Sequence, residues 1–323
     1  MIYPWQQEQW QHFLVAQNNK HLAHALLLSG MADCGKKDFA TAIAHSILCE
    51  NTDEKGKACG QCKSCHVFKA GSHPDYKCIE LLEGKKDISI AQIRELSQFL
   101  ELSCSYGQSK VAIINDVDRM NEKASNSLLK TLEEPPANTV IILETSQPSA
   151  LLATINSRCQ KIVFPVPDKA MAIAWLQTQK LDHKAENLLS IATGRPLLAK
   201  KLDDKALLDS RKSLAGDLCL LLNEQRDYVD LAKNWEKEDF QVLLNWQLAW
   251  VQDLLLKAEK SQENHKSIDI NKQLNQLFLL LNTTRLWNLY DNLLNLMKLA
   301  KHPVNKILFA EKMLLIWLET KNN

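Results

Sequence analysis

The chain has 323 residues, of which 46% are hydrophobic and 24% charged, a composition typical of a globular protein with two or three domains. A formal net charge of +1 argues against a protein that coats nucleic acid through bulk charge. No secretory signal, membrane-length apolar run or secreted disulfide framework is evident, so we expect a cytoplasmic protein without a membrane partner.

The first elements are predicted to lead into a phosphate-binding loop. Residues 5–18 have the apolar spacing of a helix, and residues 24–29 form a short apolar strand. The string GMADCGKK then matches the pattern G-x-x-x-x-G-K-[ST] at three positions, Gly30, Gly35 and Lys36. At the last position Lys37 replaces the hydroxyl residue that would bind Mg²⁺, and Asp33 adds a negative charge inside the loop. The loop is either a nucleotide pocket or a turn retained for packing, and the substitutions favour the second interpretation.

The insertion that follows carries four closely spaced cysteines. They form a C-x9-C-x2-C-x2-C array of Cys49, Cys59, Cys62 and Cys65. Thiolates at this spacing are typical of a tetrahedral structural Zn²⁺ site, and the lysines at 55, 57 and 63 would offset their charge. An iron–sulfur cluster would need another cysteine where the chain has Lys69. The array predicts structural zinc rather than scattered free thiols, with three possible substitute ligands in His45, His66 and Cys78.

The stretch from 110 to 160 predicts the centre of a parallel sheet. Residues 111–114 and 140–143 are short apolar runs of the kind that form strands buried on both faces. The helix between them can begin after Asn121 and must stop before Pro135. Two such strands joined by a helix imply a parallel sheet, and Asp116 would lie at its carboxyl edge, where open α/β folds hold ligands.

The remainder of the chain is predicted to be helical. The Pro-rich segment 164–168 marks the exit from the first domain, and residues 168–205 form a small helical unit. Leucine-rich segments with helical spacing follow near 206–223, 238–259, 271–282, 284–300 and 303–320. Five tryptophans on these segments are assigned to a bundle core, with a subunit interface as the alternative for some: Trp235, Trp246, Trp250, Trp287 and Trp317. The polar residues 260–269 are expected to form an exposed loop.

Several of these features together resemble the AAA+ subunits of bacterial DNA polymerase III clamp loaders. They are Asp116 after an apolar strand, SLLKTLEEPP at 127–136, Thr145 after the next strand, and Ser157-Arg158-Cys159. The resemblance covers essentially the whole chain. It implies an α/β plus all-α protein: an AAA+ P-loop-type parallel-sheet domain at 1–166 with a zinc-binding insertion at about 49–65, a small helical lid domain at 167–205, and a C-terminal helical collar domain for oligomerisation at 206–323.

The resemblance also implies a degenerate nucleotide site at Gly30, Gly35, Lys36, Asp116 and Thr145. Val117 stands where an ATPase of this class carries its general-base Glu, and Asp118 would point away if strand geometry continued. Arg195 is displaced from the position of the lid arginine, and Pro196 must lie in the first turn of a helix. Hydrolysis needs phosphate, metal, water and charge groups together, so we expect no independent catalysis, with ATP and Mg²⁺ used at neighbouring subunits.

The resemblance implies that Arg158 acts in trans as an arginine finger toward the nucleotide of a neighbour; the alternative is a surface arginine in a local ion pair. The resemblance thus implies a non-motor subunit within a DNA-directed DNA polymerase, a nucleotidyltransferase. Its partners would be the motor subunits, another clamp-loader subunit, the sliding clamp and primed DNA. Two alternatives stay open. An active clamp-loader ATPase of the gamma/tau kind is opposed by Lys37 and Val117, and a zinc-module nucleic-acid-binding protein is opposed by the near-neutral charge.

Overall fold

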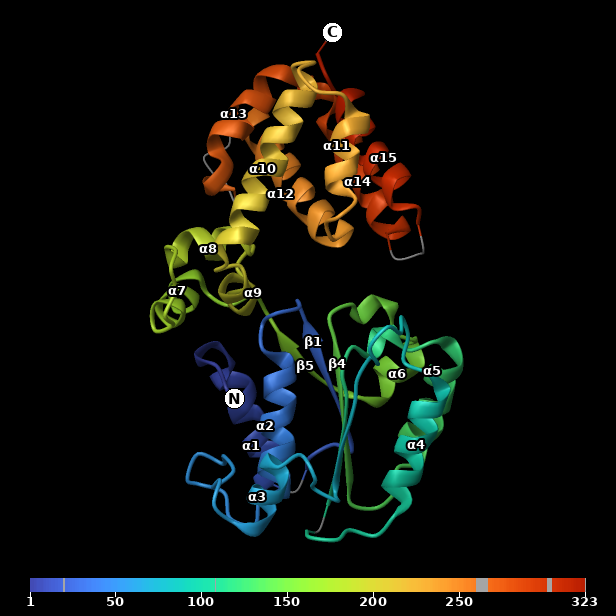
Figure 1. Ribbon diagram of the computed structural model, residues 1–323. Coiled ribbons are helices and arrows are strands. Elements are labelled where there is room, and N and C mark those ends of the chain that lie inside the picture. Colours follow the sequence, from blue (N-terminus) through green and yellow to red (C-terminus); the bar gives the residue numbers. More distant parts are fainter. Residues whose placement is uncertain (20, 108, 260–266, 301–303, 323) are drawn as a thin grey trace. The chain divides into compact units, whose positions relative to one another are not determined.

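A computed structural model describes residues 1–19, 21–107, 109–259, 267–300 and 304–322. The chain divides into two compact units, residues 1–175 with 195–197, and residues 176–194 with 198–323. The first unit contains a parallel sheet with helices on both faces, and the second is helical in its described residues (Figure 1). The expected class, an α/β unit followed by an all-α unit, is confirmed. Within the described ranges, no helix is long and apolar enough to cross a membrane.

The sheet has five parallel strands in the order β2-β3-β4-β1-β5. Their bounds are β1 (Ala25–Gly30), β2 (Tyr76–Ile79), β3 (Lys110–Ile114), β4 (Thr139–Thr145) and β5 (Gln160–Phe164). Every residue of β3 and β4 is buried, including the apolar runs 111–114 and 140–143 for which burial was predicted. The two strands pair directly, and β4 also pairs with β1, so the carboxyl ends of these three strands meet at one edge of the sheet.

Alternate residues of each strand point to opposite faces of the sheet and build two separate cores. Leu27, Ala112 and Ile141 pack with the helices α4 (Ile90–Glu101), α5 (Glu122–Glu133) and α6 (Ala153–Arg158). Leu26 and Val111 pack on the other face with α1 (Gln7–Asn18) and α2 (Lys36–Leu48). Figure 1 shows these helices on the two sides of the sheet. The shorter elements of this unit are η1 (Pro4–Gln6), α3 (Lys63–Lys69), η2 (Val117–Arg119) and η3 (Pro148–Ala150).

Helix ends and glycines in this unit follow from local sequence. Asn121 caps α5 by accepting from the Ala124 backbone N–H at 2.9 Å, and α5 ends two residues before Pro135. Gly30 has φ +153°, and a Cβ there would lie 2.2 Å from the Phe164 carbonyl oxygen. Gly35, the N-cap of α2, has φ +87°. Both positions therefore require glycine for backbone reasons alone.

The helices from residue 169 onward are α7 (Lys169–Gln177), α8 (Ala185–Ile191), α9 (Pro196–Lys201), α10 (Lys205–Leu222), α11 (Tyr228–Trp235), α12 (Phe240–Ala258), α13 (Asn271–Leu280), α14 (Leu286–Leu299) and α15 (Lys306–Leu318), with η4 (Ile268–Ile270) and η5 (Thr283–Arg285). The helix α11 was not anticipated.

Four of the five tryptophans are buried, but Trp287 is 57% exposed, so its assignment to the bundle core is wrong. The buried stripe of α14 begins at its neighbour Leu286, which turns Trp287 outward.

The expected exposed loop at 260–269 also needs correction. Residues 260–266 lie outside the described residues, but Ser267 is buried and its N–H donates to Asp253 at 2.8 Å. Arg211, itself only 1% exposed, donates to Ser267 Oγ at 3.0 Å and pairs with Asp269 at 3.1 Å. A buried guanidinium needs such partners, and here it recruits the polar residues 267 and 269 into the helical unit.

Candidate functional site

The loop between β1 and α2 places Lys36 in a buried ion pair at the carboxyl edge of the sheet. Its Nζ lies 3.0 Å from Oε1 of Glu144, and both side chains are 2% exposed. The same ammonium donates to the Met31 carbonyl at 2.8 Å and to Ser146 Oγ at 3.2 Å. All three partners are oxygens of the chain itself, so the phosphate-binding lysine of the motif already has a full set of acceptors.

Lys37 makes the second ion pair of this edge. Its Nζ lies 2.6 Å from Asp116 Oδ2, and the Asp116 N–H donates to Glu144 Oε2 at 3.1 Å. Lys36, Glu144, Asp116 and Lys37 therefore form two ion pairs that the Asp116 N–H joins, and we call these four residues the lysine–carboxylate network. Burial works to lower the pKa of Lys37, but the hydrogen bond to Asp116 and the charges of Asp116, Glu144 and Glu80 raise it overall. An ammonium thus contacts the carboxylate that would otherwise serve Mg²⁺ in such a loop.

Asp118 does not point away as the strand geometry predicted. The backbone of Asp116 is left-handed, with φ +50°, and the short helix η2 follows it. This turn brings Asp118 Oδ1 to 2.5 Å from Thr145 Oγ1 and 3.3 Å from the Ser146 N–H, both of which donate to it. The hydroxyl of Thr145, the residue expected to act as a polar sensor, is therefore engaged within the chain.

Side chains near the N-terminus form hydrogen bonds to the phosphate-binding loop and to the start of α2. Trp5 Nε1 and Gln6 Nε2 both donate to the Cys34 carbonyl at 3.0 Å, and Tyr3 Oη donates to Asp38 at 2.8 Å. The rings of Tyr3 and Trp5 stack with centroids 4.9 Å apart, and Trp175 meets each of them edge-on. Sequence reasoning missed these contacts, because no motif marks a lone aromatic residue near a chain end.

A further contact to the loop comes from residues 195–197. Asp33 has φ +60°, and its carbonyl accepts from the Leu197 N–H at 3.3 Å. Burial lowers the pKa of Arg195, while the nearby charge of Asp33 opposes that effect. Pro196 is the first residue of α9, which is the position that its missing N–H and fixed φ allow.

The four cysteines of the insertion converge on one point. Their Sγ atoms all lie within 4.8 Å of one another, and four of the Sγ–Sγ distances are 3.6, 3.6, 3.9 and 4.0 Å. Four sulfurs placed tetrahedrally at about 2.3 Å from a zinc ion have edges of about 3.8 Å. The donor set and its spacing therefore fit the ion, and Cys49, Cys59, Cys62 and Cys65 could hold zinc.

Backbone donors favour a thiolate at Cys59, whereas burial raises the pKa of Cys49 and Cys65. The N–H groups of Gln61 and Cys62 each lie 3.4 Å from Cys59 Sγ, and they lower the pKa of Cys59 to about 6. The Cys65 N–H lies 3.4 Å from Cys62 Sγ. The three possible substitute ligands have other surroundings: His45 stacks on Phe68 at 4.4 Å, and neither His66 nor Cys78 belongs to the cluster found among the described residues.

His73 and Asp75 connect the cysteine insertion to the sheet, a role that sequence reasoning missed. His73 Nδ1 accepts from the Asp75 N–H at 3.1 Å, so its Nε2 carries the proton and donates to Ser64 Oγ at 3.0 Å. Ser64 donates onward to the Leu48 carbonyl at 2.5 Å. The carboxylate of Asp75 is fully buried and accepts from the N–H groups of Ser105 and Tyr106. Ser64 lies within the cysteine array, so this chain of bonds fixes the array against β2.

Arg158 lies apart from these groups, at the last residue of α6 and directly before Cys159 and β5. Its Nη2 lies 2.6 Å from Glu133 Oε1 on α5, and its Nη1 donates to the Thr154 carbonyl at 3.0 Å. The Arg158 side chain is 34% exposed and that of Glu133 is 50% exposed. The guanidinium is thus held at the protein surface by one carboxylate and one carbonyl.

Comparison with known proteins shows the family to which this chain belongs. A family model described as "DNA polymerase III, delta subunit" matches residues 5–168, about half of the chain. The chain is 34% identical to DNA polymerase III subunit delta' of Pseudomonas aeruginosa over 98% of this chain and 97% of that protein. It belongs to the DNA polymerase III subunit delta' family. This membership confirms the resemblance that SLLKTLEEPP and SRC carried.

Two other proteins match much of the chain. The DNA polymerase III subunit delta' of Escherichia coli is 29% identical over 78% of this chain and 76% of that protein. Among solved structures, a DNA polymerase III gamma subunit-related protein of Thermotoga maritima matches with a TM-score of 0.47 and 19% identity, covering 95% of this chain and 99% of that one.

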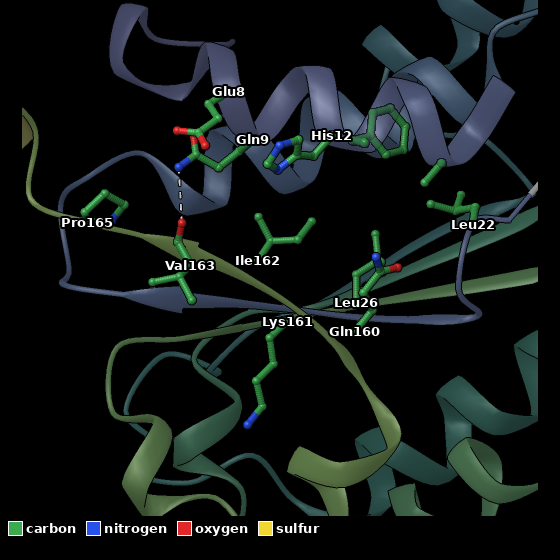
Figure 2. Close-up of a pocket in the computed structure, with 12 residues that line it drawn as sticks. Glu8, Gln9, His12, Leu22, Leu26, Gln160, Lys161, Ile162, Val163 and Pro165 are labelled. Carbon is green, nitrogen blue, oxygen red and sulfur yellow. Dashed lines mark hydrogen bonds between the residues drawn. The ribbon is translucent and has the colours of Figure 1, made fainter. Parts of the chain in front are cut away.

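A pocket of about 490 Å³ lies between α1 and the edge strand β5 of this delta' family chain (Figure 2). Gln9 on α1 lines it and donates to the Val163 carbonyl at 3.2 Å, and Glu8 and His12 come from the same helix. In Figure 2 the side chain of Lys161 points away from α1. No residue of the lysine–carboxylate network, the cysteine cluster or Arg158 lines this pocket. The pocket is therefore separate from the residues that the sequence indicated.

Proposed function

We propose that the chain is a non-hydrolysing subunit of a DNA polymerase III clamp loader and that it presents Arg158 to ATP bound by a neighbouring motor subunit. The observation that carries this proposal is the lysine–carboxylate network. Each charged group that a hydrolytic P-loop would offer to Mg²⁺ and ATP has a counter-charge inside the chain: Lys36 with Glu144, and Lys37 with Asp116.

Binding of Mg²⁺-ATP would have to disrupt both pairs. Moving Lys36 toward a phosphate would leave Glu144 buried without its partner, and losing one member of a buried pair costs on the order of 3–5 kcal/mol. A Mg²⁺ ion would have to displace the Lys37 ammonium from Asp116. Val117 is an apolar, buried residue at the position of the general base, so it cannot activate water. ATP and Mg²⁺ would then be used at neighbouring subunits.

Several features support a role for Arg158 in trans. It ends a helix at the protein surface, and its guanidinium is held by side-chain and carbonyl acceptors that a phosphate could replace. Arginine supplied in trans contributes on the order of 10³–10⁵ in rate in related phosphoryl-transfer systems. The partners of the chain would be the motor subunits and one further clamp-loader subunit, with the sliding clamp and primed DNA reached through the complex.

The other parts of the proposal rest on the family and on the cysteine geometry. We assign the domains as a sheet domain at 1–166, a lid at 167–205 and a collar at 206–323 that joins neighbouring subunits. The four cysteines would hold one structural zinc ion, with no ligand position left for a reactive water. A subunit of the bacterial replication machinery would work in the cytoplasm.

The test is Arg158→Ala in the complete reconstituted complex with its motor subunits and clamp. We expect the variant to fold, because Arg158 is partly exposed, and to remove the contribution of the motor site that it serves to steady-state ATP hydrolysis. Arg94→Ala, which removes an exposed arginine on α4, is the matched control and should leave turnover unchanged. Unchanged turnover in Arg158→Ala would exclude the role in trans.

A further inference from the structure

The pair between Glu133 and Arg158 joins two helix ends that the chain places side by side. Glu133 is the last residue of α5, which stops there because two prolines follow at 135 and 136. Arg158 is the last residue of α6, and the helices α5 and α6 pack together. The 2.6 Å contact therefore links SLLKTLEEPP to SRC, the two sequence segments that first characterised the chain.

This contact competes with delivery of the arginine to a phosphate. While Glu133 is bound, its carboxylate neutralises the guanidinium and contacts the Nη2 atom through Oε1. A phosphate approaching the pair would meet the negative charge of Glu133 as well as the positive charge of Arg158. Arginine recognises carboxylates and phosphates with the same donor fork, so the two compete for it directly. A nucleotide phosphate carries more negative charge than one carboxylate and can replace it.

We infer that Glu133 is a positioning residue that holds Arg158 in the free subunit and releases it when the nucleotide phosphates of a neighbour take its place. This inference rests on the proposed role of Arg158 in trans. Because the pair is exposed, its contribution is small, and removing it changes an equilibrium only about two- to five-fold. The pair therefore keeps the arginine oriented between assembly events without preventing its use.

The first experiment uses the free full-length chain and does not depend on any function. Phenylglyoxal modification of Arg158 is followed by mass spectrometry in the wild-type chain and in Glu133→Gln. We expect Glu133→Gln to raise the modification rate about two- to five-fold, with the difference shrinking at high salt because exposed pairs are screened. Glu134→Gln is the matched control. It removes the same charge one residue away, and among the described residues the ion pair of Arg158 is with Glu133 and not with Glu134. Equal rates for all three chains would overturn the inference.

The second experiment titrates the motor subunits with each variant in the reconstituted complex and measures ATP hydrolysis. We expect Glu133→Gln to reach half-maximal stimulation at a two- to five-fold lower chain concentration, and to have no effect when Arg158 is already alanine. A lower maximal rate for Glu133→Gln would mean that Glu133 orients the arginine during catalysis, which contradicts release. If Arg158→Ala itself leaves turnover unchanged, the proposed function fails; if only Glu133→Gln is silent, the inference alone fails.

Discussion

The helix α2 has a group of charged or polar side chains at each end, and the two groups differ in what balances their charges. At its first residue, Lys36 pairs with Glu144, and Lys37 pairs with Asp116 one residue later. Directly after its last residue, Cys49 joins a cluster of four sulfurs whose close neighbours are one another and backbone N–H groups. At the first end, side chains of the chain itself balance the charges. The other brings together donors that suit an added cation.

The difference follows from the charges that each loop can carry. Lysine and carboxylate side chains neutralise each other without any ligand, so the first loop keeps its geometry when nucleotide and metal are absent. Four thiolates at 3.6–4.0 Å would repel strongly, and a bound metal relieves this repulsion while releasing their protons. The charges at the start of α2 therefore need no ligand to balance them, whereas the cysteines that follow its end need a bound metal.

The largest effect is expected from removing a sulfur from the cluster. Cys62→Ser keeps the N-cap of α3, because serine is a good capping residue, and so it isolates the loss of a metal ligand. We expect bound zinc to fall from about one per chain to a small fraction, and the insertion to lose about 5 kcal/mol or more of stability. Metal analysis and denaturant unfolding measure the two effects.

Cys104→Ser serves as the control, since this cysteine lies outside the cluster and should leave both metal content and stability unchanged. Wild-type protein purified without added metal should contain zinc. Iron in its place, or no metal at all, would mean that the cluster is not a zinc site, and the contrast between the two ends of α2 would disappear.

The buried pair gives the next largest effect. Glu144→Leu leaves the Lys36 ammonium buried without its carboxylate, so we expect a loss of about 3–5 kcal/mol in the free energy of unfolding. Adding Lys36→Met should recover part of that loss, because the unpaired charge is gone. Urea unfolding of the two single variants and the double variant gives the coupling energy, which we expect to reach about 2 kcal/mol or more.

The exposed pair of Asp230 and Lys233 provides the reference for such a cycle, and its coupling should stay below about 1 kcal/mol. If the coupling of Lys36 with Glu144 were no larger, the network would not hold the edge of the sheet. Nucleotide binding would then not have to disrupt a costly interaction.

Local sequence predicted the elements of this edge but not the pairs between them. Residues 111–114 of β3 and 140–143 of β4 are apolar, and Asn121 marks the start of the helix between them, so these elements were predictable. Glu144 was not identified as the partner of Lys36, because that pairing depends on β1 and β4 lying side by side. The turn of Asp118 toward Thr145 depends on a left-handed backbone at Asp116, a conformation that no periodic pattern reports.

The smallest effect on stability is expected from Lys37→Thr. The pair of Lys37 with Asp116 is exposed, so its loss should cost less than about 1 kcal/mol. Threonine restores the hydroxyl of the phosphate-binding pattern and frees Asp116, so we expect the variant to gain binding of Mn²⁺ in the presence of ATP, measured by water-proton relaxation.

Lys37→Met is the matched control, because it frees Asp116 without supplying a hydroxyl, and it should bind the ion more weakly than Lys37→Thr. Metal-dependent ATP binding by the wild-type chain would show that the lysine–carboxylate network is open to ligand after all. If Lys37→Thr gains no Mn²⁺ binding, the buried pair of Lys36 and Glu144 is what prevents binding at this edge of the sheet. That pair still holds the phosphate-binding lysine after Lys37 has been replaced.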